Sequence, residues 1–516
     1  MPPTTGTIQL DGHSLTLESI EAAARGRAAV ELTAAAQQGV EASSQRVRAL
    51  ARGDRAVYGV NTGFGIFANR RIPPDELAAL SRNLVLSHAV GVGDPFPRDV
   101  TRAAMVVRAN TLAIGLSGVA PPVLAALLDL VNRDVTPAIP SQGSLGSSGD
   151  LAPLAHLALA LTAPELVPDS PAAWLGEERL PLRQALQRAG IQPVGLGPKD
   201  GLALTNGATF AAAMLSLACL DLARCLAAAE AAAALSLEAL CAVSSAFDER
   251  LHAARPHPGQ LRVARRLRQL TQGSRLLDSG DQVQDAYSLR CIPQVLGPVW
   301  EILEFDRGVA EREVNSATDN PLLFDDTAIS GGNFHGEPIG LASDYLKTAA
   351  CEVGALSERR TFRLLSAHTS AGLPPMLVVR PDQAGVQSGL MMLQYTAASL
   401  VLENEGLASP ASVRSLPTSA DQEDHNANAT TAARELLRVL GNVERIVAIE
   451  LATAAQALDL RRQAAPTRSP GKGVQAIHGR IRERVPLIET DSVMTPHIES
   501  LVALIRTDGW LPPGPG

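Results

Sequence analysis

Aromatic residues are scarce in this chain. They make up 3% of its 516 residues, whereas hydrophobic residues of all kinds make up 46%, so alanine, leucine and valine must build most of the core. Alanine and leucine favour closely packed helices, whereas sheets are usually rich in aromatic and β-branched residues. The composition therefore predicts a mostly α-helical protein, and its length suffices for several layers of core or for more than one domain.

Cysteine is also rare. The five cysteines are scattered between residues 219 and 351, their number is odd, and no two have the spacing of zinc ligands. The chain has no His-Glu-x-x-His sequence, which argues further against a zinc enzyme. Residues 1–5 lack the pattern of a signal peptide. We therefore expect a cytoplasmic protein with reduced, mostly buried thiols.

Runs of basic residues are absent, and the formal net charge is -8. This charge disfavours binding to nucleic acid or to an anionic membrane surface. The longest uncharged stretches contain Pro121 and Pro122, or Thr205 with Asn206 and Gly207. Such residues indicate buried helices and not membrane spans.

Small residues are concentrated at positions 143–149, which read Gly-Ser-Leu-Gly-Ser-Ser-Gly. Glycine permits backbone angles and close approaches that other residues avoid. Apolar stretches with helical periodicity, 123–131 and 154–161, flank this loop. A tight loop between buried helices is a typical place for a strained functional site.

Three chemistries could use this loop. A nucleophilic serine on a Gly-x-Ser-x-Gly turn is excluded, because no serine has glycine at both offsets. A phosphate-binding loop is excluded because the required lysine is missing. The third is self-condensation, in which the Gly149 nitrogen attacks the Ser147 carbonyl carbon and Ser148 loses water, which creates an electrophile. A glycine-rich turn without chemistry remains the simpler alternative.

Three single residues stand out along the first half of the chain. Tyr58 lies on the glycine-rich stretch 57–65 and could be a general base on a mobile loop, or could merely fill a turn. His88 ends an apolar helical stretch, where a lone histidine is more often a core residue. Asn206 precedes a long Ala/Leu helix expected from about residue 208, and suits its N-cap.

Gln284, Tyr287 and Arg290 are spaced three apart, so a helix would place them on one face. A guanidinium binds both oxygens of a carboxylate at once, which suits an amino acid or other acid as ligand. The alternative is an ordinary solvated helix face. Phe334, in the polar loop 330–338, is by itself more typical of a core residue.

Six motifs between residues 57 and 425 resemble those of the aromatic amino acid ammonia-lyases, and occur in that family's order. Residues 58–65 read Tyr-Gly-Val-Asn-Thr-Gly-Phe-Gly and residues 150–156 read Asp-Leu-Ala-Pro-Leu-Ala-His. The patches 284–290, 315–321 and 330–338 follow. Ser87-His88 and Glu423 are similar to the histidine ammonia-lyase branch of the family.

The resemblance implies that residues 147–149 form a 4-methylidene-imidazol-5-one by themselves, with no dissociable cofactor and no metal. It implies ammonia elimination from L-histidine, a small-molecule substrate, to give urocanate. The implied catalytic residues are Tyr58, Ser147, Ser148, Gly149, Asn206, Tyr287 and Phe334. The implied substrate-binding residues are His88, Gln284, Arg290 and Glu423.

The resemblance also implies a mostly α-helical fold of the fumarase/aspartase-like superfamily, with a long central helix bundle. The expected domains are 1–205 with the cyclised loop, 206–461 with the bundle, and 462–516 as a C-terminal helical segment and tail. A homotetramer with active sites shared between subunits is expected.

Three departures from the family pattern keep alternatives open. Ser147 replaces alanine, Ala286 replaces proline, and residues 426–428 read Asn-Ala-Asn in place of Val-Ser-Met. A tyrosine or phenylalanine ammonia-lyase, or an aminomutase of the same family, is the first alternative. A fumarase-type helical lyase and a helical scaffold without activity are more distant ones.

Overall fold

The computed structural model describes residues 6–167, 172–325, 327–507 and 509–510. Helices account for 58% and strands for 7% of the chain, which confirms the expected mostly α-helical fold. Two sequence-based expectations concern residues outside the described ones, namely the absence of a signal peptide in residues 1–5 and the end of the C-terminal tail, residues 511–516.

The chain divides into two compact units. The first unit comprises residues 1–218, 306–344 and 410–434, and the second comprises residues 219–305, 345–409 and 435–516. The units are therefore not consecutive stretches of chain, unlike the expected segments 1–205, 206–461 and 462–516. The difference arises because four long helices, α9, α13, α14 and α16, each contribute residues to both units.

Short helices and small sheets make up the first unit. Its sheets are the parallel pair β1–β2 and the antiparallel groups β3–β5, β4–β6–β7 and β8–β9. The strands are β1 (Ile8–Leu10), β2 (Val30–Leu32), β3 (Val92–Pro95), β4 (Val135–Pro137), β5 (Pro140–Gln142), β6 (Ala173–Leu175), β7 (Glu178–Leu180), β8 (Leu322–Phe324) and β9 (Thr327–Ile329). The helices are α1 (Leu17–Ala24), α2 (Ala34–Arg52), α3 (Leu77–His88), α4 (Arg98–Ala113), α5 (Pro121–Asn132), α6 (Leu151–Thr162), α7 (Leu182–Ala189) and α8 (Asp200–Thr205).

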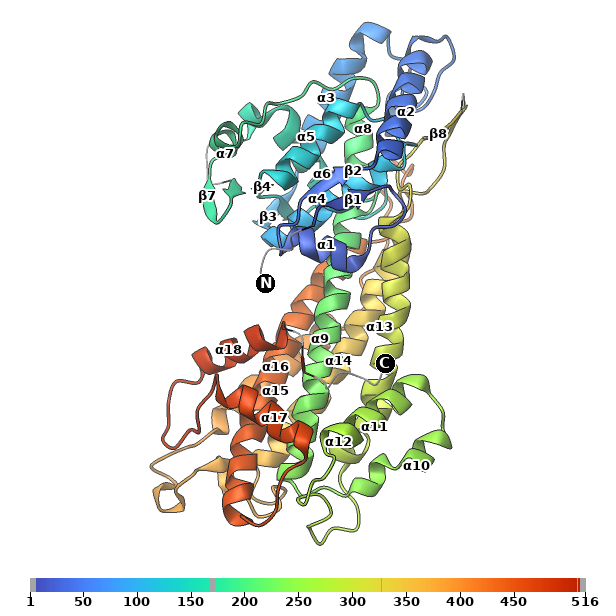
Figure 1. Cartoon of the computed structure of the whole chain (residues 1–516). Helices are drawn as coiled ribbons and strands as arrows, with labels where there is room; N and C mark the ends of the chain where they lie inside the picture. The colour runs from blue at the N-terminus through green and yellow to red at the C-terminus, as the bar shows by residue number, and fades with distance from the viewer. Residues whose placement is uncertain (1–5, 168–171, 326, 508, 511–516) are drawn as a thin grey trace. The chain divides into compact units, whose positions relative to one another are not determined.

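Helix α4 forms the centre of the first unit (Figure 1). Every residue from Val100 to Ala113 is buried, and α4 packs against α1, α2 and α5. Helix α6 is similarly apolar and packs against α3 and α8. The glycine- and serine-rich loop 143–149 joins β5 to α6, so both of its ends are fixed in this core.

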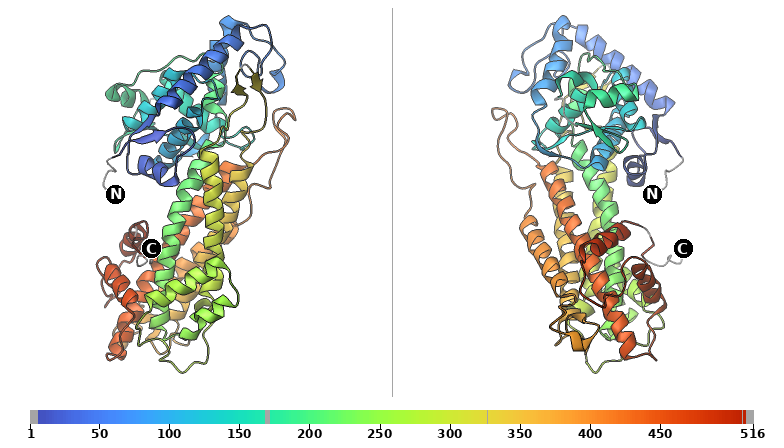
Figure 2. Two further views of the ribbon diagram at one scale, coloured as in Figure 1. Left: turned by 45° about the vertical axis from the view of Figure 1, so that its right-hand side comes forward. Right: turned by 90° about the vertical axis from the view of Figure 1, so that its left-hand side faces the viewer.

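Long helices dominate the second unit. They are α9 (Thr209–Ala239), α13 (Ile292–Val314), α14 (Glu337–Leu365) and α16 (Ala429–Ala464), and they run alongside one another in both views of Figure 2. The shorter helices are α10 (Glu249–Ala253), α11 (Pro258–Leu270), α12 (Tyr287–Arg290), α15 (Met391–Leu407), α17 (Lys472–Arg482) and α18 (Thr495–Ile505).

A buried carboxylate ties three of these long helices together. Glu450 on α16 accepts hydrogen bonds from Ser236 on α9 at 2.7 Å and from Ser357 on α14 at 2.6 Å. Arg360 on α14 forms an ion pair with the same carboxylate. Both charged groups are fully buried, so each depends on the other to offset its lost hydration.

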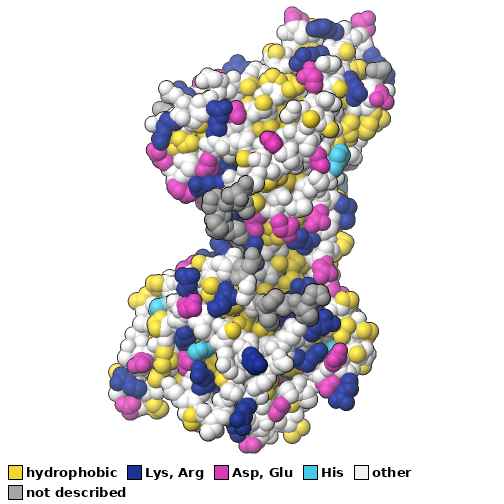
Figure 3. All heavy atoms as spheres, viewed as in Figure 1, with side chains coloured by type: hydrophobic (Ala, Val, Ile, Leu, Met, Phe, Trp, Pro, Cys, Tyr) yellow, Lys and Arg dark blue, Asp and Glu magenta, His cyan; other side chains and the backbone are white. Residues whose placement is uncertain are grey.

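Helix α9 is long and apolar enough to cross a membrane, but 83% of its most apolar window is buried inside the structure. It is thus a core helix, as Thr205, Asn206 and Gly207 just before it indicated in the sequence. Lysine and arginine side chains are interspersed with aspartate and glutamate over the displayed face of the molecule (Figure 3).

Candidate active site

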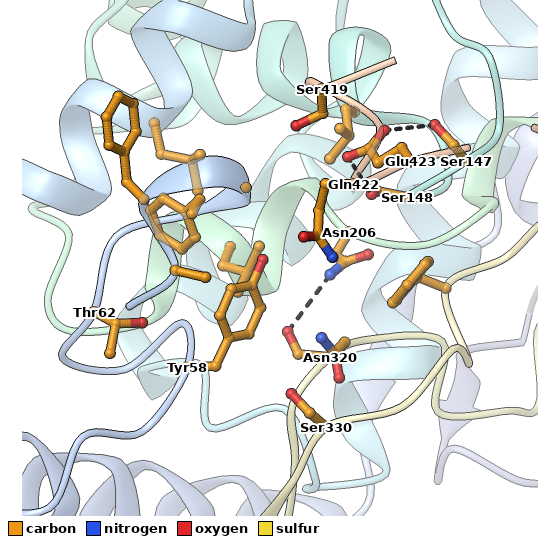
Figure 4. Close-up of a pocket in the computed structure, with 18 of the residues that line it drawn as sticks. Tyr58, Thr62, Ser147, Ser148, Asn206, Asn320, Ser330, Ser419, Gln422 and Glu423 are labelled. Atoms are coloured by element: carbon orange, nitrogen blue, oxygen red, sulfur yellow. Dashed lines mark hydrogen bonds between the residues drawn. The ribbon is translucent and has the colours of Figure 1, made fainter. Parts of the chain in front are cut away.

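A pocket of about 950 Å³ lies within the first unit. Its walls come from separate stretches of chain, which are 56–69, 84–88, 147–151, 202–206, 320–335 and 419–425. The sequence singles out Tyr58, His88, Ser147, Ser148, Asn206, Phe334 and Glu423, and all of them line this pocket. Figure 4 shows that Ser147, Ser148 and Glu423 lie close together and that the Tyr58 hydroxyl points into the pocket.

The loop 143–149 crosses another segment at very short range. Gly149 and Gly207 form a parallel bridge, in which Asp150 N donates to Gly207 O at 2.9 Å and Gly207 N donates to Ser148 O at 3.1 Å. A Cβ added to Gly149 would lie 2.0 Å from the Gly207 carbonyl carbon, and Gly149 has a φ of +79°. Glycine is therefore required at position 149.

The geometry of this crossing fits a self-condensing triplet. No hydrogen bond to another described residue occupies the Gly149 nitrogen, which is the atom that would attack Ser147. The Ser148 carbonyl, which would become the ring carbonyl, is already held by the Gly207 amide. The backbone is thus fixed around the reacting atoms without engaging the nucleophilic nitrogen.

Asp150, which directly follows the loop 143–149, anchors it to the core. It is fully buried, and its carboxylate accepts from Ser144 Oγ at 2.9 Å, from Ala211 N at 3.0 Å and from Thr430 Oγ1. Burial raises the pKa of Asp150, while these hydrogen bonds oppose the shift. Asp150 binds the first turn of α9, so the loop and this long helix are joined directly.

Two serine hydroxyls of the loop reach one carboxylate. Ser147 Oγ donates to Glu423 Oε2 at 2.8 Å, and Ser148 Oγ donates to Glu423 Oε1 at 3.2 Å. Glu423 lies 276 residues beyond Ser147 in the chain. Both oxygens of the carboxylate are thereby oriented at the pocket wall.

A strained turn presents Glu423. Thr418 and Glu423 form an antiparallel bridge, and three of the four residues between them, Ser419, Ala420 and Asp421, have positive φ, at 52°, 52° and 64°. Non-glycine residues in the left-handed region cost on the order of 1–2 kcal/mol each. Such strain is typical of functional sites, where the surrounding structure enforces an otherwise unfavourable backbone.

Tyr58 and His88 face the same pocket with oppositely shifted pKa values. Burial raises the pKa of the Tyr58 phenol, and the negative charge of Glu423 raises it further. Burial lowers the pKa of His88, although the nearby Glu423 charge favours the protonated ring. Ser87 Oγ lies 3.0 Å from His88 Nδ1 at the end of α3. Both shifts favour the neutral side chains near neutral pH.

Asn206 does not cap α9, and that expectation was wrong. The first turn of α9 is bound by Asp150, whereas Asn206 ends α8 through its backbone N–H, which donates to Leu202 O at 3.0 Å. The Asn206 side chain turns to the pocket, where Nδ2 donates to Asn320 O at 3.5 Å. Its buried Oδ1 has no hydrogen-bond partner among the described residues and is available to a ligand.

Gln284, Tyr287 and Arg290 belong to the second unit and are not among the described residues that line the pocket. They do not share one helix either, because α12 begins at Tyr287 and leaves Gln284 in the preceding segment. Arg290 Cζ lies 4.7 Å from the centre of the Tyr287 ring, so these two side chains form a cation–π pair.

The pocket also contains residues that the sequence did not single out, namely Asn320, His335, Gln422 and His425. The rings of His335 and His425 stack at 5.9 Å, and His335 Nε2 lies 3.2 Å from His425 O. All four belong to or border the matched motifs, which is the one signal that could have found them. No lysine or arginine is among the described lining residues, so the walls offer an acceptor and proton-transfer groups but no fixed cation.

Comparisons with known proteins cover nearly the whole chain. The sequence model of the family described as aromatic amino acid lyase matches residues 15–483. A histidine ammonia-lyase of Gloeobacter violaceus is 48% identical over 98% of this chain and 97% of that protein. One from Anaeromyxobacter sp. is 48% identical over 98% of this chain and 99% of that protein.

Solved structures give the same result for the fold. The crystal structure of histidine ammonia-lyase from Trypanosoma cruzi is 36% identical, with a TM-score of 0.87, and the match covers 97% of this chain and 93% of that one. Tyrosine aminomutase from Streptomyces globisporus is 35% identical, with a TM-score of 0.89 and 97% coverage of both chains.

Proposed function

This chain belongs to the aromatic amino acid lyase family, and from that premise we propose that it eliminates ammonia from L-histidine and releases urocanate. The arrangement that carries the proposal is the contact of Ser147 and Ser148 with Glu423, in a pocket that also contains His88. The names of the relatives support a carbon–nitrogen lyase that acts on histidine.

We infer that residues 147–149 become a 4-methylidene-imidazol-5-one. The Gly149 nitrogen bonds to the Ser147 carbonyl carbon, and that carbonyl oxygen leaves as water as a C=N bond forms to the Ser148 nitrogen. Ser148 then loses its α-proton and its hydroxyl as a second water, which leaves an exocyclic methylene. This group would supply an electrophile for the substrate, which ordinary side chains do not provide. The glycine crossing supports the inference, and so does the Gly149 nitrogen, which donates to no described residue.

The residues of this pocket have distinct tasks in the proposed reaction. Tyr58 removes the β-proton of the substrate, since its hydroxyl points into the pocket. His88 and Glu423 hold the imidazole by hydrogen bonds to its two nitrogens. Asn206 binds the substrate through its unpaired Oδ1. Phe334 packs against the ring.

The substrate carboxylate needs a cation, and the described residues that line this pocket include no lysine or arginine. We propose that Arg290, with Gln284 and Tyr287, reaches the site of a neighbouring subunit in a homotetramer. Tyr287 is 70% exposed in the single chain. Further exposed apolar side chains of the second unit support association, and they include Tyr345, Met392, Tyr395 and Leu402.

We also propose a cytoplasmic location. No disulfide joins any of the five cysteines, all of which lie among the described residues, and three of them are buried, as expected for a protein of a reducing compartment.

A second candidate function is an aminomutase, which the similarity to tyrosine aminomutase favours. An aminomutase returns the amine to the carbon skeleton, so it yields a β-amino acid without net release of ammonia. The two candidates therefore differ in their products and can be separated by measuring them.

A substrate panel tests the proposed function. The purified protein is incubated with L-histidine, L-tyrosine or L-phenylalanine, and ultraviolet absorbance of the unsaturated acid is followed together with free ammonium. We expect equal amounts of urocanate and ammonium from histidine, and a protein mass that is two waters below the value for the sequence.

Ser148→Ala should lose the activity and at least one of these water deficits. Preferred turnover of tyrosine or phenylalanine would contradict the substrate assignment.

A further inference from the structure

We propose that Ser147 is a positioning residue, whose hydroxyl holds the Glu423 carboxylate in place once the prosthetic group has formed. The proposal rests on the proposed function and extends it to a residue at which this chain departs from the family pattern, which has alanine there. Ser147 is only 8% exposed, so water competes little for its hydroxyl.

The geometry assigns different carboxylate oxygens to the two serines. Ser147 Oγ donates to Oε2 of Glu423 at 2.8 Å, and Ser148 Oγ donates to Oε1 at 3.2 Å. Thr418 Oγ1 lies 3.5 Å from Oε2, at the limit of a hydrogen bond. Ser147 therefore makes the shortest of the three contacts to this carboxylate.

Ring formation affects the two serines unequally. Only the carbonyl carbon of Ser147 enters the ring, so its side chain stays intact. Ser148 loses its hydroxyl as water and with it the contact to Oε1. The mature site thus keeps the Ser147 contact to Oε2, while Oε1 becomes free to accept a hydrogen bond from the substrate.

Glu423 lines the pocket in which the imidazole is expected to bind. A hydrogen bond to one oxygen fixes the carboxylate and thereby aims the other, and such preorganisation avoids the cost of ordering Glu423 when the substrate binds. Once Ser148 has lost its hydroxyl, alanine at position 147 would leave Oε2 with the long contact to Thr418 as its one hydrogen bond from the described part of the chain. A hydrogen bond to a charged group commonly changes affinity by roughly tenfold or more.

Ser147→Ala is the direct test, because it supplies the residue that the family pattern has and leaves Ser148 and Gly149 unchanged. The variant should retain the deficit of two waters. It should show a kcat/KM for histidine about tenfold below that of the wild type, and a similarly raised inhibition constant for urocanate. Inhibition by cinnamate, which has no imidazole, should change little. Ser147→Thr, which keeps the hydroxyl, should restore urocanate binding.

A double-mutant cycle separates positioning from a general structural effect. In a Glu423→Gln background, Ser147→Ala should cause little further loss, because the two side chains act through one contact. Equal losses in both backgrounds, or equal weakening of urocanate and cinnamate, would overturn the proposal. If the wild type lacks the deficit of two waters, the proposed function fails too. If both proteins show the deficit but bind urocanate equally, only the role of Ser147 is wrong.

Discussion

Tyr58 and Glu423 influence each other through the pocket. In the proposed reaction the Tyr58 phenol must lose its proton to act as a base, yet burial raises its pKa and the Glu423 charge raises it further. The negative charge therefore makes the phenolate harder to form in the free protein. Binding of a substrate that pairs with Glu423 would reduce this opposition and favour the basic form of Tyr58.

We predict that Tyr58 titrates above the ordinary tyrosine pKa of about 10. The chain has four tyrosines, so a spectrophotometric titration of the wild type minus that of Tyr58→Phe isolates this residue. In Glu423→Gln the Tyr58 transition should move to lower pH, because burial remains and the neighbouring negative charge is removed. An unchanged transition would contradict the coupling.

Asp306 gives a prediction about stability. Its side chain is fully buried, and neither carboxylate oxygen has a hydrogen-bond partner among the described residues. Burial raises its pKa from 3.8 to about 8. The folded state thus prefers the neutral acid, and the resulting stability is complete below pH 4 and is lost as the pH rises through 8.

Asp306→Asn should therefore raise Tm at pH 8 by a few degrees or more relative to the wild type, and should change it less at pH 5. Thermal unfolding followed by circular dichroism at both pH values measures this. Glu304→Gln, on the same helix but at a more exposed position, is the control and should show no such pH dependence. An equal effect of Asp306→Asn at both pH values would argue against a titrating carboxyl.

The sequence predicted some residues of the pocket better than others. Tyr58 and Ser148 stand in runs of glycine and serine whose composition is unusual by itself. The contact between Ser147 and Glu423 spans 276 residues, and no local rule of sequence predicts it. Asn206 shows the limit most clearly, because its position suits a helix cap while its side chain serves the pocket.

At the level of elements, the crossing of Gly149 and Gly207 joins the loop 143–149 to the start of α9. Gly207 has a φ of +105°, and a Cβ there would lie 2.6 Å from Thr318 Oγ1. Helices α5, α6 and α9 were predicted because their apolar residues form a local pattern, whereas the helix expected to carry Gln284 with Tyr287 and Arg290 begins only at Tyr287. This crossing was not predicted, because it depends on two segments that meet only in the folded chain.

Gly207→Ala should therefore prevent or strongly slow ring formation, although it alters none of residues 147–149. We expect intact-mass measurement to show most of the protein without the deficit of two waters, and Tm to fall by an amount that corresponds to about 1 kcal/mol or more. Gly195→Ala is a matched control, because no atom lies within 4 Å of its added Cβ. Full ring formation in Gly207→Ala would show that the crossing is dispensable.

At the level of the whole molecule, Arg290, which we propose binds the substrate carboxylate, belongs to the second unit, whereas the loop 147–149, which we propose binds the amine, belongs to the first. The fold class followed from composition and from the resemblance. The division into units did not, because α9, α13, α14 and α16 continue through the boundaries without any change in composition that would mark them.

Complementation between variants tests whether sites are shared. Ser148→Ala and Arg290→Ala should each be nearly inactive. When the two chains are coexpressed or are refolded together, histidine turnover should reappear, because some sites then combine an intact Ser148 with an intact Arg290 from another subunit. Mixing without subunit exchange is the control. No recovery in verified mixed oligomers would place both residues in the same chain's site.

The glycine crossing also determines when during folding the protein becomes active. On the proposed chemistry, a newly synthesised chain is inactive. Residues 147–149 are aligned only when Gly207, which follows α6 and α8 in the chain, has bound beside them. The onset of turnover then reports that this part of the chain has reached its native arrangement. Misfolded chains would therefore not form the electrophile, and the reactive group would be confined to correctly folded protein.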